Sequence, residues 1–527
     1  MLRFSIVFTV VACTLSPASA FAWQGKAEFE AALADWQHKA GPVHGQQIGH
    51  AIHEMYAARD YAPLWTIIPE REKIAVDVIR VLESADSAGL DPRDYQVASP
   101  DSPQSWIDFE LGMSAAFVRY AADQQSGRVD PEVVDDDQSY EPPALKIPAL
   151  LTVMANSSNP ALLLRSLVPP HPAYDDLVQI LADLRRSHAN GGWPSPEIIS
   201  RKLEMGMQGD EVDSLRRYLV STGDLAVDDA ALTRPYDASL KQAVQRFQTR
   251  HGLDRDGIVG PVTKAAMAVS VDTRMAQVVA NMERWRWMPQ QLGEEHIVVN
   301  AADFSLTLVE EGEVVDTFPV IVGQPFHRTP MFSRKMTYLV LNPYWNVPYS
   351  IASSEILTKQ QQDPLYLEAH NFEVLDREER VVDPAGVDWN AIRSDQFPFH
   401  VRQKPGGGNA LGQIKFMLPN KYSVYLHDTP AKSLFSRARR AFSHGCVRVF
   451  DPLRLAGRVL KGKGWTRADL LDQMARHENK TVWLPRPIPV HLVYFTVWKD
   501  KSGMVQFRDD IYGRDRKLLA ALASRAR

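Results

Sequence analysis

Cysteine is scarce in this 527-residue chain, which contains only Cys13 and Cys446. If Cys13 is removed with an N-terminal leader, no internal disulfide is possible. A single remaining cysteine is either a small apolar core residue or a reactive thiol. The sequence around Cys446 therefore has to distinguish a structural role from a chemical one.

An excess of positive charge is also lacking. The chain has 59 Lys and Arg residues against 64 Asp and Glu residues, a formal net charge of −5. Because nucleic-acid binding depends on a basic surface, we predict no nucleic-acid partner. Beyond the N-terminus no apolar run reaches the ~18 residues that a membrane-spanning helix needs, so we also predict no transmembrane span.

The rest of the composition is ordinary for a globular protein, with 45% hydrophobic and 23% charged residues. At roughly 150 residues per domain, the length indicates three to four domains. The sequence is therefore long enough to form several separate cores.

The first 20 residues have the features of a secretory signal peptide. Arg3 precedes an apolar run at 4–12, and the small residues 18–20 form a cleavage site. We therefore expect an exported protein that begins after Ala20. An alternative is that 10–13 resembles a bacterial lipoprotein cleavage box, which would leave a lipidated Cys13.

Residues 24–200 are predicted to form a helical domain. Apolar residues recur at helical spacing in 71–90 and 174–186, and Gly- and Pro-containing connections separate the helices. The acidic stretch 133–137 is interpreted as a solvated loop.

Residues 203–268 are predicted to form a compact three-helix unit. Leu215, Leu219, Leu240, Val244 and Phe247 fall at spacings of three and four. One helix is expected to end at Gly252, and another to begin after Gly260-Pro261. This segment resembles the peptidoglycan-binding domain found beside cell-wall enzymes, which implies docking on murein glycan through 203–268. The alternative is a degenerate module that serves only in packing.

A connecting helix at 274–289 is expected to lead into a β-rich domain at 296–485. Residues 297–308 and 314–322 are rich in β-branched and aromatic residues and are predicted to form a hairpin. An insertion at about 350–400 interrupts this pattern and is expected to cap the site as a lid. Residues 486–527 are predicted to be a C-terminal extension packed on the scaffold or catalytic domain. The fold class is thus multidomain α+β.

The segment 443–448 has the residues that a cysteine nucleophile needs. Cys446 requires a base, donors for an oxyanion and a group that holds the acyl donor. Gly445 allows a sharp turn, and the amides of Gly445 and Cys446 could face an oxyanion. Asp451-Pro452 predicts a helix start close by, which is expected to lower the pKa of the Cys446 thiol.

Two histidines could serve as the base. His444 lies two residues from Cys446, where a tight turn hinders side-chain contact, whereas His427 comes from another segment. If 423–428 is a strand, Tyr425 and His427 share one face and Asp428 lies on the other. We therefore favour His427, oriented by a backbone carbonyl, and expect Asp428 to stabilise the following loop.

The motif Ser443-His444-Gly445-Cys446-x-Arg448 resembles that of the YkuD-type L,D-transpeptidase catalytic domain. Further similarity to the large periplasmic members of this family lies in a set of segments: 322–323, 329–330, 342–348, 402–412, 487–494 and 507–513. The resemblance implies a helical scaffold, a peptidoglycan-binding domain and a β-rich catalytic domain with an inserted cap.

The resemblance also assigns roles. It implies Cys446 as nucleophile, His427 as base, Gly445, His444 and Ser443 as oxyanion or supporting residues, and Arg448 and Tyr425 as substrate-binding residues. The implied partners are peptidoglycan stem peptides, a tetrapeptide donor and a diamino-acid acceptor, joined as 3→3 cross-links in the periplasm. No cofactor or metal is implied, and carbapenems are expected to acylate the thiol.

Other chemistries are weaker alternatives. The glycine-rich 405–409 could suggest a phosphate loop, but no Gly-Lys-Ser or Gly-Lys-Thr follows it. His427, His444, Asp428 and Cys446 could bind zinc in a murein hydrolase, although ligands two residues apart are cramped. A non-catalytic peptidoglycan-binding protein with Cys446 as a relic is the third alternative.

Overall fold

The computed structural model describes residues 26–39, 44–65, 69–98, 103–227 and 234–525. The chain forms two compact units, which are described separately below. The first contains the described residues within 26–83, 92–121 and 145–166, and the second contains those within 84–91, 122–144 and 167–525. Within the described residues, no helix is both long and apolar enough to cross a membrane.

The first unit is helical. It contains α1 (Lys26–Lys39), α2 (His44–Ala57), α3 (Pro69–Glu83), most of α4 (Pro103–Ser126), α6 (Ile147–Asn156) and α7 (Pro160–Ser166). At its centre the buried Glu110 carboxylate accepts hydrogen bonds from the Tyr56 hydroxyl at 2.9 Å and from the Trp65 amide at 3.1 Å. These bonds compensate the cost of burying a carboxylate.

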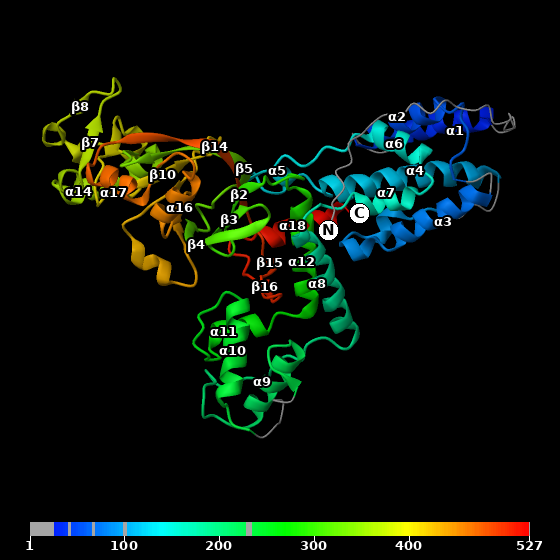
Figure 1. Ribbon diagram of the computed structural model, residues 1–527, viewed down its shortest axis with the longest axis horizontal. Helices are drawn as coiled ribbons and strands as arrows, with labels where there is room; N and C mark the ends of the chain where they lie inside the picture. The colour runs from blue at the N-terminus through cyan, green and yellow to red at the C-terminus, as the bar shows by residue number, and fades with distance from the viewer. Residues whose placement is uncertain (1–25, 40–43, 66–68, 99–102, 228–233, 526–527) are drawn as a thin grey trace. The chain divides into compact units, whose positions relative to one another are not determined.

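The second unit takes up part of the stretch that the sequence suggests as a single helical domain. Helix α8 (Pro172–Ala189) packs along α12 (Val271–Arg286), and the two lie side by side in Figure 1. The apolar face of α8, including Leu177 and Leu181, joins the same core as Val278 and Met282. Helical spacing reveals such a face but not its partner, so sequence patterns alone do not show that α8 packs against α12.

Residues 203–268 form a small helical module with its own core. It contains α9 (Asp210–Ser221), α10 (Ala238–Arg250) and α11 (Pro261–Met267). As expected, the chain turns at Gly252 with a φ of 66°, and Gly260-Pro261 begins α11. We call residues 203–268 the module below.

The β-rich domain, which the sequence resemblance implies is catalytic and which is called the catalytic domain below, is built on a ten-stranded mixed sheet among the described residues. Its strands follow the order β1-β5-β10-β11-β13-β4-β3-β2-β14, with β12 paired to β4 and with β14 also paired to β5, which closes the sheet. The bounds are β1 (Gln138–Ser139), β2 (Glu295–Asn300), β3 (Ser305–Glu310), β4 (Glu313–Gly323), β5 (Met331–Leu341), β10 (Ile414–Met417), β11 (Leu426–His427), β12 (Ala441–Ser443), β13 (Val447–Val449) and β14 (Lys480–Val493). The catalytic region is therefore β-rich, and the predicted fold class is confirmed.

The predicted hairpin is confirmed by the antiparallel pairing of β3 with β4, but its first arm, 297–308, is two strands and not one. A turn separates β2 from β3, and Phe304 has a φ of 56°. The Asn300 side chain stabilises this turn by accepting a hydrogen bond from the Ala302 amide at 3.2 Å. Asn300 and Asp303 are residues that favour turns, so this turn has a local signal in the sequence.

Strand β14 runs through the boundary that the sequence suggests at 485–486. It pairs with β2 in parallel and with β5 in antiparallel fashion. Pro485 and Pro487 give the appearance of a break because proline cannot donate to a ladder. The ladder to β5 shifts register between Trp483 and Ile488, so the prolines lie in this irregular stretch.

Beyond β14 the chain forms β15 (Val497–Lys499), β16 (Val505–Phe507) and α18 (Arg514–Arg525). The Tyr140 hydroxyl donates to the Leu492 carbonyl at 3.0 Å, which ties β1's segment to β14. Phe507, Leu518 and Leu522 join the core of the sheet, so the C-terminal residues pack on the catalytic domain, which is one of the two expected alternatives.

The inserted cap has its own sheet and core. Strands β6 (Trp345–Asn346), β9 (His400–Gln403), β7 (Phe372–Leu375) and β8 (Val381–Val382) pair in that order. The helical stretch at 352–362 ends in α14 (Leu357–Gln362), and α15 (Tyr366–Ala369) follows; β7, β8 and α14 lie together in Figure 1. Ile356, Leu357, Val374 and Phe397 belong to the buried core.

The acidic stretch 133–137 is partly solvated, since Val133 and Asp136 are exposed, but Asp135 is an exception. Asp135 is buried, and its carboxylate lies 3.3 Å from the buried Arg514 Nε and 3.2 Å from Arg328 Nη2. Arg514 also donates to the Thr329 carbonyl at 3.1 Å. Charge alone predicts exposure, but cations from distant segments compensate this carboxylate.

Replacing Arg514 with Met should leave Asp135 buried beside fewer cations and lower the free energy of unfolding of the catalytic domain by about 3 kcal/mol or more. Urea unfolding followed by tryptophan fluorescence measures this change. The exposed neighbour Arg516, replaced with Met, is the matched control and should change stability little. Equal effects of the two substitutions would show that the buried ion pair is not a main support.

Candidate active site

The candidate residues meet on one face of the sheet. Strands β11 and β13 are parallel, with Leu426 opposite Val447 and His427 opposite Arg448. Alternate residues of a strand share a face, so Tyr425 and His427 lie on the same face as Cys446 and Arg448. The rings of Tyr425 and His427 are 5.6 Å apart in an edge-to-face arrangement, which agrees with this placement.

Lys415 belongs to the same group, although sequence analysis does not identify it. It lies on β10 opposite His427, and its Nζ is 3.8 Å from the centre of the Tyr425 ring. Burial lowers the pKa of Lys415, and the neighbouring Cys446 partly opposes this. The only sign of this role in the sequence is that Lys415 interrupts the apolar stretch 414–418. Such a pattern does not reveal which strand pairs with this segment.

The turn before Cys446 is held by hydrogen bonds to neighbouring groups. The Ser443 hydroxyl donates to the Cys446 carbonyl at 2.5 Å, and the Thr329 hydroxyl donates to the Gly445 carbonyl at 2.9 Å. Gly445 has a φ of 111°, a conformation that favours glycine. Its amide, expected to face an oxyanion, instead donates to the Ser443 hydroxyl at 3.2 Å.

The loop that supplies Thr329 is fixed from the C-terminal region. The Tyr512 hydroxyl donates to the Gly323 carbonyl at 2.7 Å, and the Gly323 amide donates to the Thr329 hydroxyl at 2.9 Å. A Cβ at Gly323 would lie 2.0 Å from the His327 carbonyl oxygen, so only glycine fits. Tyr512 thus supports the turn at Gly445 from 67 residues further along the chain.

His427 is buried, with 4% of its surface exposed. Its Nδ1 bonds to the Asp428 carbonyl, which confirms the expected backbone partner, and the Leu411 backbone also interacts with the ring. Burial, together with the positive charge of Arg448, lowers the pKa of His427 to about 3. The imidazole is therefore neutral at pH 7.

Cys446 is partly exposed, and its sulfur lies 4.0 Å from the Ser423 carbonyl oxygen. Burial raises the pKa of the thiol, while hydrogen bonding by Tyr425 and the charges of Lys415 and Arg448 oppose the rise. The expectation of a lowered pKa is therefore wrong. The predicted helix α16 (Pro452–Val459) does begin after Asp451, but burial of the sulfur is the largest influence on the pKa of the thiol.

Asp428 and His444 have partners that point away from a role as base. Asp428 accepts hydrogen bonds from the Gln413 amide at 2.9 Å and from Lys432 Nζ at 2.7 Å, so its carboxylate stabilises the surrounding loops as expected. His444 Nε2 lies 2.8 Å from Glu355 Oε1 in the cap. His444 thus connects the turn at Cys446 to the inserted domain.

Arg448 has a hydrogen-bond donor that is not used within the described part of the protein. Its Nε is buried and has no hydrogen-bond partner among the described residues. Burial lowers the pKa of Arg448, and Cys446 opposes this. With Lys415, it places two cations on the face that holds the thiol.

The alternatives from the sequence gain no support from the geometry. In the described part of the chain, the acidic, histidine or cysteine side chains close enough to share a metal ion are Asp135, Asp136 and Asp137, a group that does not include Cys446 and that is already paired with Arg328. In the glycine-rich 405–409, buried Asn409 donates to the Pro343 carbonyl at 3.1 Å and the Lys404 carbonyl at 2.9 Å. This loop therefore joins the two ends of the cap.

Comparison with known families agrees with this arrangement. Residues 294–469 match the YkuD family model, described as the L,D-transpeptidase catalytic domain. The resemblance to L,D-transpeptidases is confirmed. Residues 50–181 match the Scaffold domain model, and residues 208–267 match a model described as "Putative peptidoglycan binding domain".

Individual relatives have related names. A Haemophilus influenzae protein named "Putative L,D-transpeptidase" is 37% identical over 250 residues, which are 47% of this chain and 50% of the relative. The match thus spans about half the length of that curated relative. A crystal structure of an L,D-transpeptidase from Xylanimonas cellulosilytica aligns with 56% of this chain and 99% of its own at 16% identity, with a TM-score of 0.18. A TM-score this low does not establish a shared fold.

The low pKa of His427 gives a testable pH dependence of stability. An unfolded histidine takes up a proton near pH 6.5, whereas buried His427 does so only near pH 3, so stability should fall as the pH drops through this range. Between pH 7 and pH 4, the free energy of unfolding of His427→Gln, measured in urea, should fall by roughly 3 kcal/mol less than that of the original protein. Replacement of exposed His400 with Gln is the control, and identical pH dependence of all three proteins would contradict a buried neutral imidazole.

Proposed function

We propose that this protein is a cysteine-dependent L,D-transpeptidase that forms 3→3 cross-links in peptidoglycan outside the cytoplasm. The observation that carries the proposal is the shared face of Cys446 and His427 on paired strands β11 and β13. The family match to the catalytic domain and the module's match to a peptidoglycan-binding model support the substrate class.

The first half of the reaction forms a thioester. The Cys446 sulfur attacks the carbonyl carbon between the third and fourth residues of a tetrapeptide stem, while the thiol proton passes to His427 Nε2. The C–N bond then breaks, and His427 returns the proton to the leaving D-Ala amine. Because both groups are neutral at rest, this proton transfer accompanies the attack.

The second half transfers the acyl group to a second stem. The side-chain amine of its diamino acid attacks the thioester carbon, gives a proton to His427 and forms the new amide bond. The sulfur leaves and regains the proton. The Cys446 amide, which has no acceptor among the described residues, supplies an oxyanion donor in both halves.

The cations beside the thiol suit the donor stem. Arg448 and Lys415 face the site without a carboxylate within ion-pair distance among the described residues. A stem peptide carries free carboxylates, so these two side chains hold the donor next to Cys446. The cap, connected through Glu355 and His444, limits the access of water to the thioester.

A direct experiment is to incubate the full exported chain with purified disaccharide-tetrapeptide and identify products by mass spectrometry. We expect free D-Ala and a dimer that has lost one D-Ala. Cys446→Ala should form neither product, and Cys446→Ser keeps a similar volume as the control for folding. Release of D-Ala without a dimer would indicate a carboxypeptidase, and dimer formation by Cys446→Ala would exclude the thioester mechanism.

The assignment of the base is tested by comparing two histidines. His427→Ala should slow acylation of Cys446 by about 10²-fold or more, because a general base is lost. His444→Ala should slow it less, since His444 contacts the cap. A much larger loss in His444→Ala, measured by single-turnover acylation, would reverse the assignment.

A further inference from the structure

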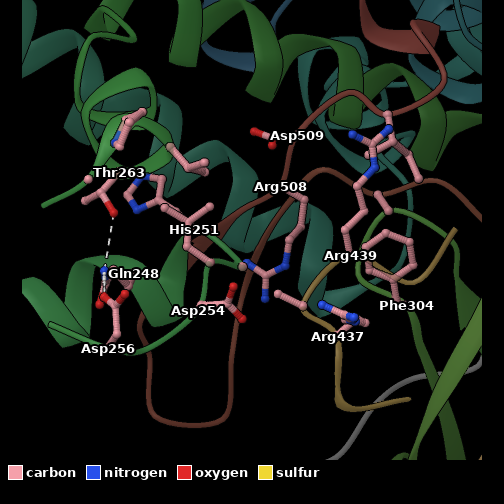
Figure 2. A pocket seen from close by; sticks show the side chains of 18 of the residues that line it. Gln248, His251, Asp254, Asp256, Thr263, Phe304, Arg437, Arg439, Arg508 and Asp509 are labelled. Carbon is pink, nitrogen blue, oxygen red and sulfur yellow. Dashed lines mark hydrogen bonds between the residues drawn. The ribbon is translucent and has the colours of Figure 1, made fainter. Parts of the chain in front are cut away.

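A cleft of about 810 Å³ lies where the module meets the catalytic domain. One wall comes from the end of α10, the loop after it and the start of α11 in the module. The other wall comes from 434–442 and 508–511 of the catalytic domain, and both appear in Figure 2. We call it the module cleft.

The base of the module cleft is a packed junction. Arg508 donates to the Arg250 carbonyl at 3.1 Å and bonds to the Asp303 carboxylate at 2.8 Å. The His251 ring stacks on Phe507, with centroids 5.6 Å apart. A Cβ on Gly252 would lie 2.6 Å from Arg508 Cδ, so the two walls meet closely there.

Above this base, the walls of the module cleft expose charged and apolar side chains. Arg437 and Arg439 are exposed, and within the described residues neither guanidinium has a carboxylate within 4.0 Å. Phe442 on the same wall is 38% exposed, and Val262 on the module wall is 65% exposed. Asp254 of the module is exposed and also lines the cleft.

We propose that the module cleft binds a stem peptide of a peptidoglycan strand, an inference that rests on the proposed function and assigns it a second binding site. A stem has free carboxylates and the amine of its diamino acid. Arg437 and Arg439 pair with the carboxylates, and Asp254 pairs with the amine. Phe442 and Val262 pack against the apolar parts of the stem and the adjoining sugar.

The position of the wall connects this binding to catalysis. Residues 434–442 lead directly into the turn at Ser443, and Phe442 lies four positions before Cys446 in the sequence. A chain of four residues spans at most about 14 Å. A peptidoglycan strand that is bound in the module cleft through one stem peptide therefore keeps its neighbouring stem peptides close to the Cys446 thiol.

The test compares two double variants of the full exported chain. Arg437→Glu with Arg439→Glu reverses two charges in the cleft, and Lys463→Glu with Arg467→Glu reverses two exposed charges outside it. Pelleting with insoluble peptidoglycan gives the affinity. The cleft variant should bind at least tenfold more weakly than the original protein, and the control variant should bind within about twofold of it.

A chemically modified ligand identifies the contact. When the carboxylates of the peptidoglycan are converted to amides, the affinity of the original protein should fall. The affinity of the cleft variant, which is already weak, should change little on the same treatment. The ratio of turnover on intact peptidoglycan to turnover on soluble disaccharide-tetrapeptide should also fall at least tenfold in the cleft variant. Because pelleting does not depend on catalysis, it still tests the cleft if the tetrapeptide assay fails.

The opposite wall is tested by Val262→Asp, with exposed Val227→Asp as the control within the module. Val262→Asp should weaken pelleting and Val227→Asp should not. Unchanged pelleting by both Arg437→Glu with Arg439→Glu and Val262→Asp would overturn the proposal. Equal weakening by the cleft and control variants would also overturn it, since general charge would then explain binding.

Discussion

The parallel pairing of β11 with β13 is the contact on which the candidate site depends. It joins two segments that are separated in sequence by a loop and brings His427 to the face that holds Cys446. Pairing of β10 with β11 adds Lys415 to the same face. A slip of one residue in either ladder would turn His427 or Lys415 to the opposite face, because side chains alternate along a strand. The closed sheet and the bonds from Tyr512 and Thr329 oppose such a slip.

Burial sets the electrostatics of this site. It raises the pKa of the Cys446 thiol and lowers that of His427 to about 3, so the resting pair is neutral. Lys415 and Arg448 favour the thiolate but disfavour a protonated imidazole, because both are cations. The site is thus suited to a negative charge that develops on the acyl donor. An ion pair of thiolate and imidazolium, common in other cysteine enzymes, is not the resting state that this environment favours.

Local signals explain what the sequence could predict. Gly252 and Gly260-Pro261 mark the helix ends in the module because their backbone preferences act within a few residues. The motif around Cys446 likewise indicates its turn, and strand alternation places Tyr425 and His427 together. Features that depend on distant partners were not predicted: the register that adds Lys415, the cations that bury Asp135 and the passage of β14 across Pro485 and Pro487. The pKa of Cys446 belongs to this second group, since burial is its largest influence and depends on how distant segments pack.

The central claim is that a neutral Cys446–His427 pair carries out acylation. The most direct measurement is the rate at which a carbapenem acylates Cys446, followed by intact-protein mass between pH 5 and pH 8. If both groups stay neutral throughout this range, the rate should change by less than about threefold, and Cys446→Ala should gain no drug mass. A rate that rises about tenfold per pH unit would show that a pre-formed thiolate, independent of His427, is the nucleophile and would contradict the account.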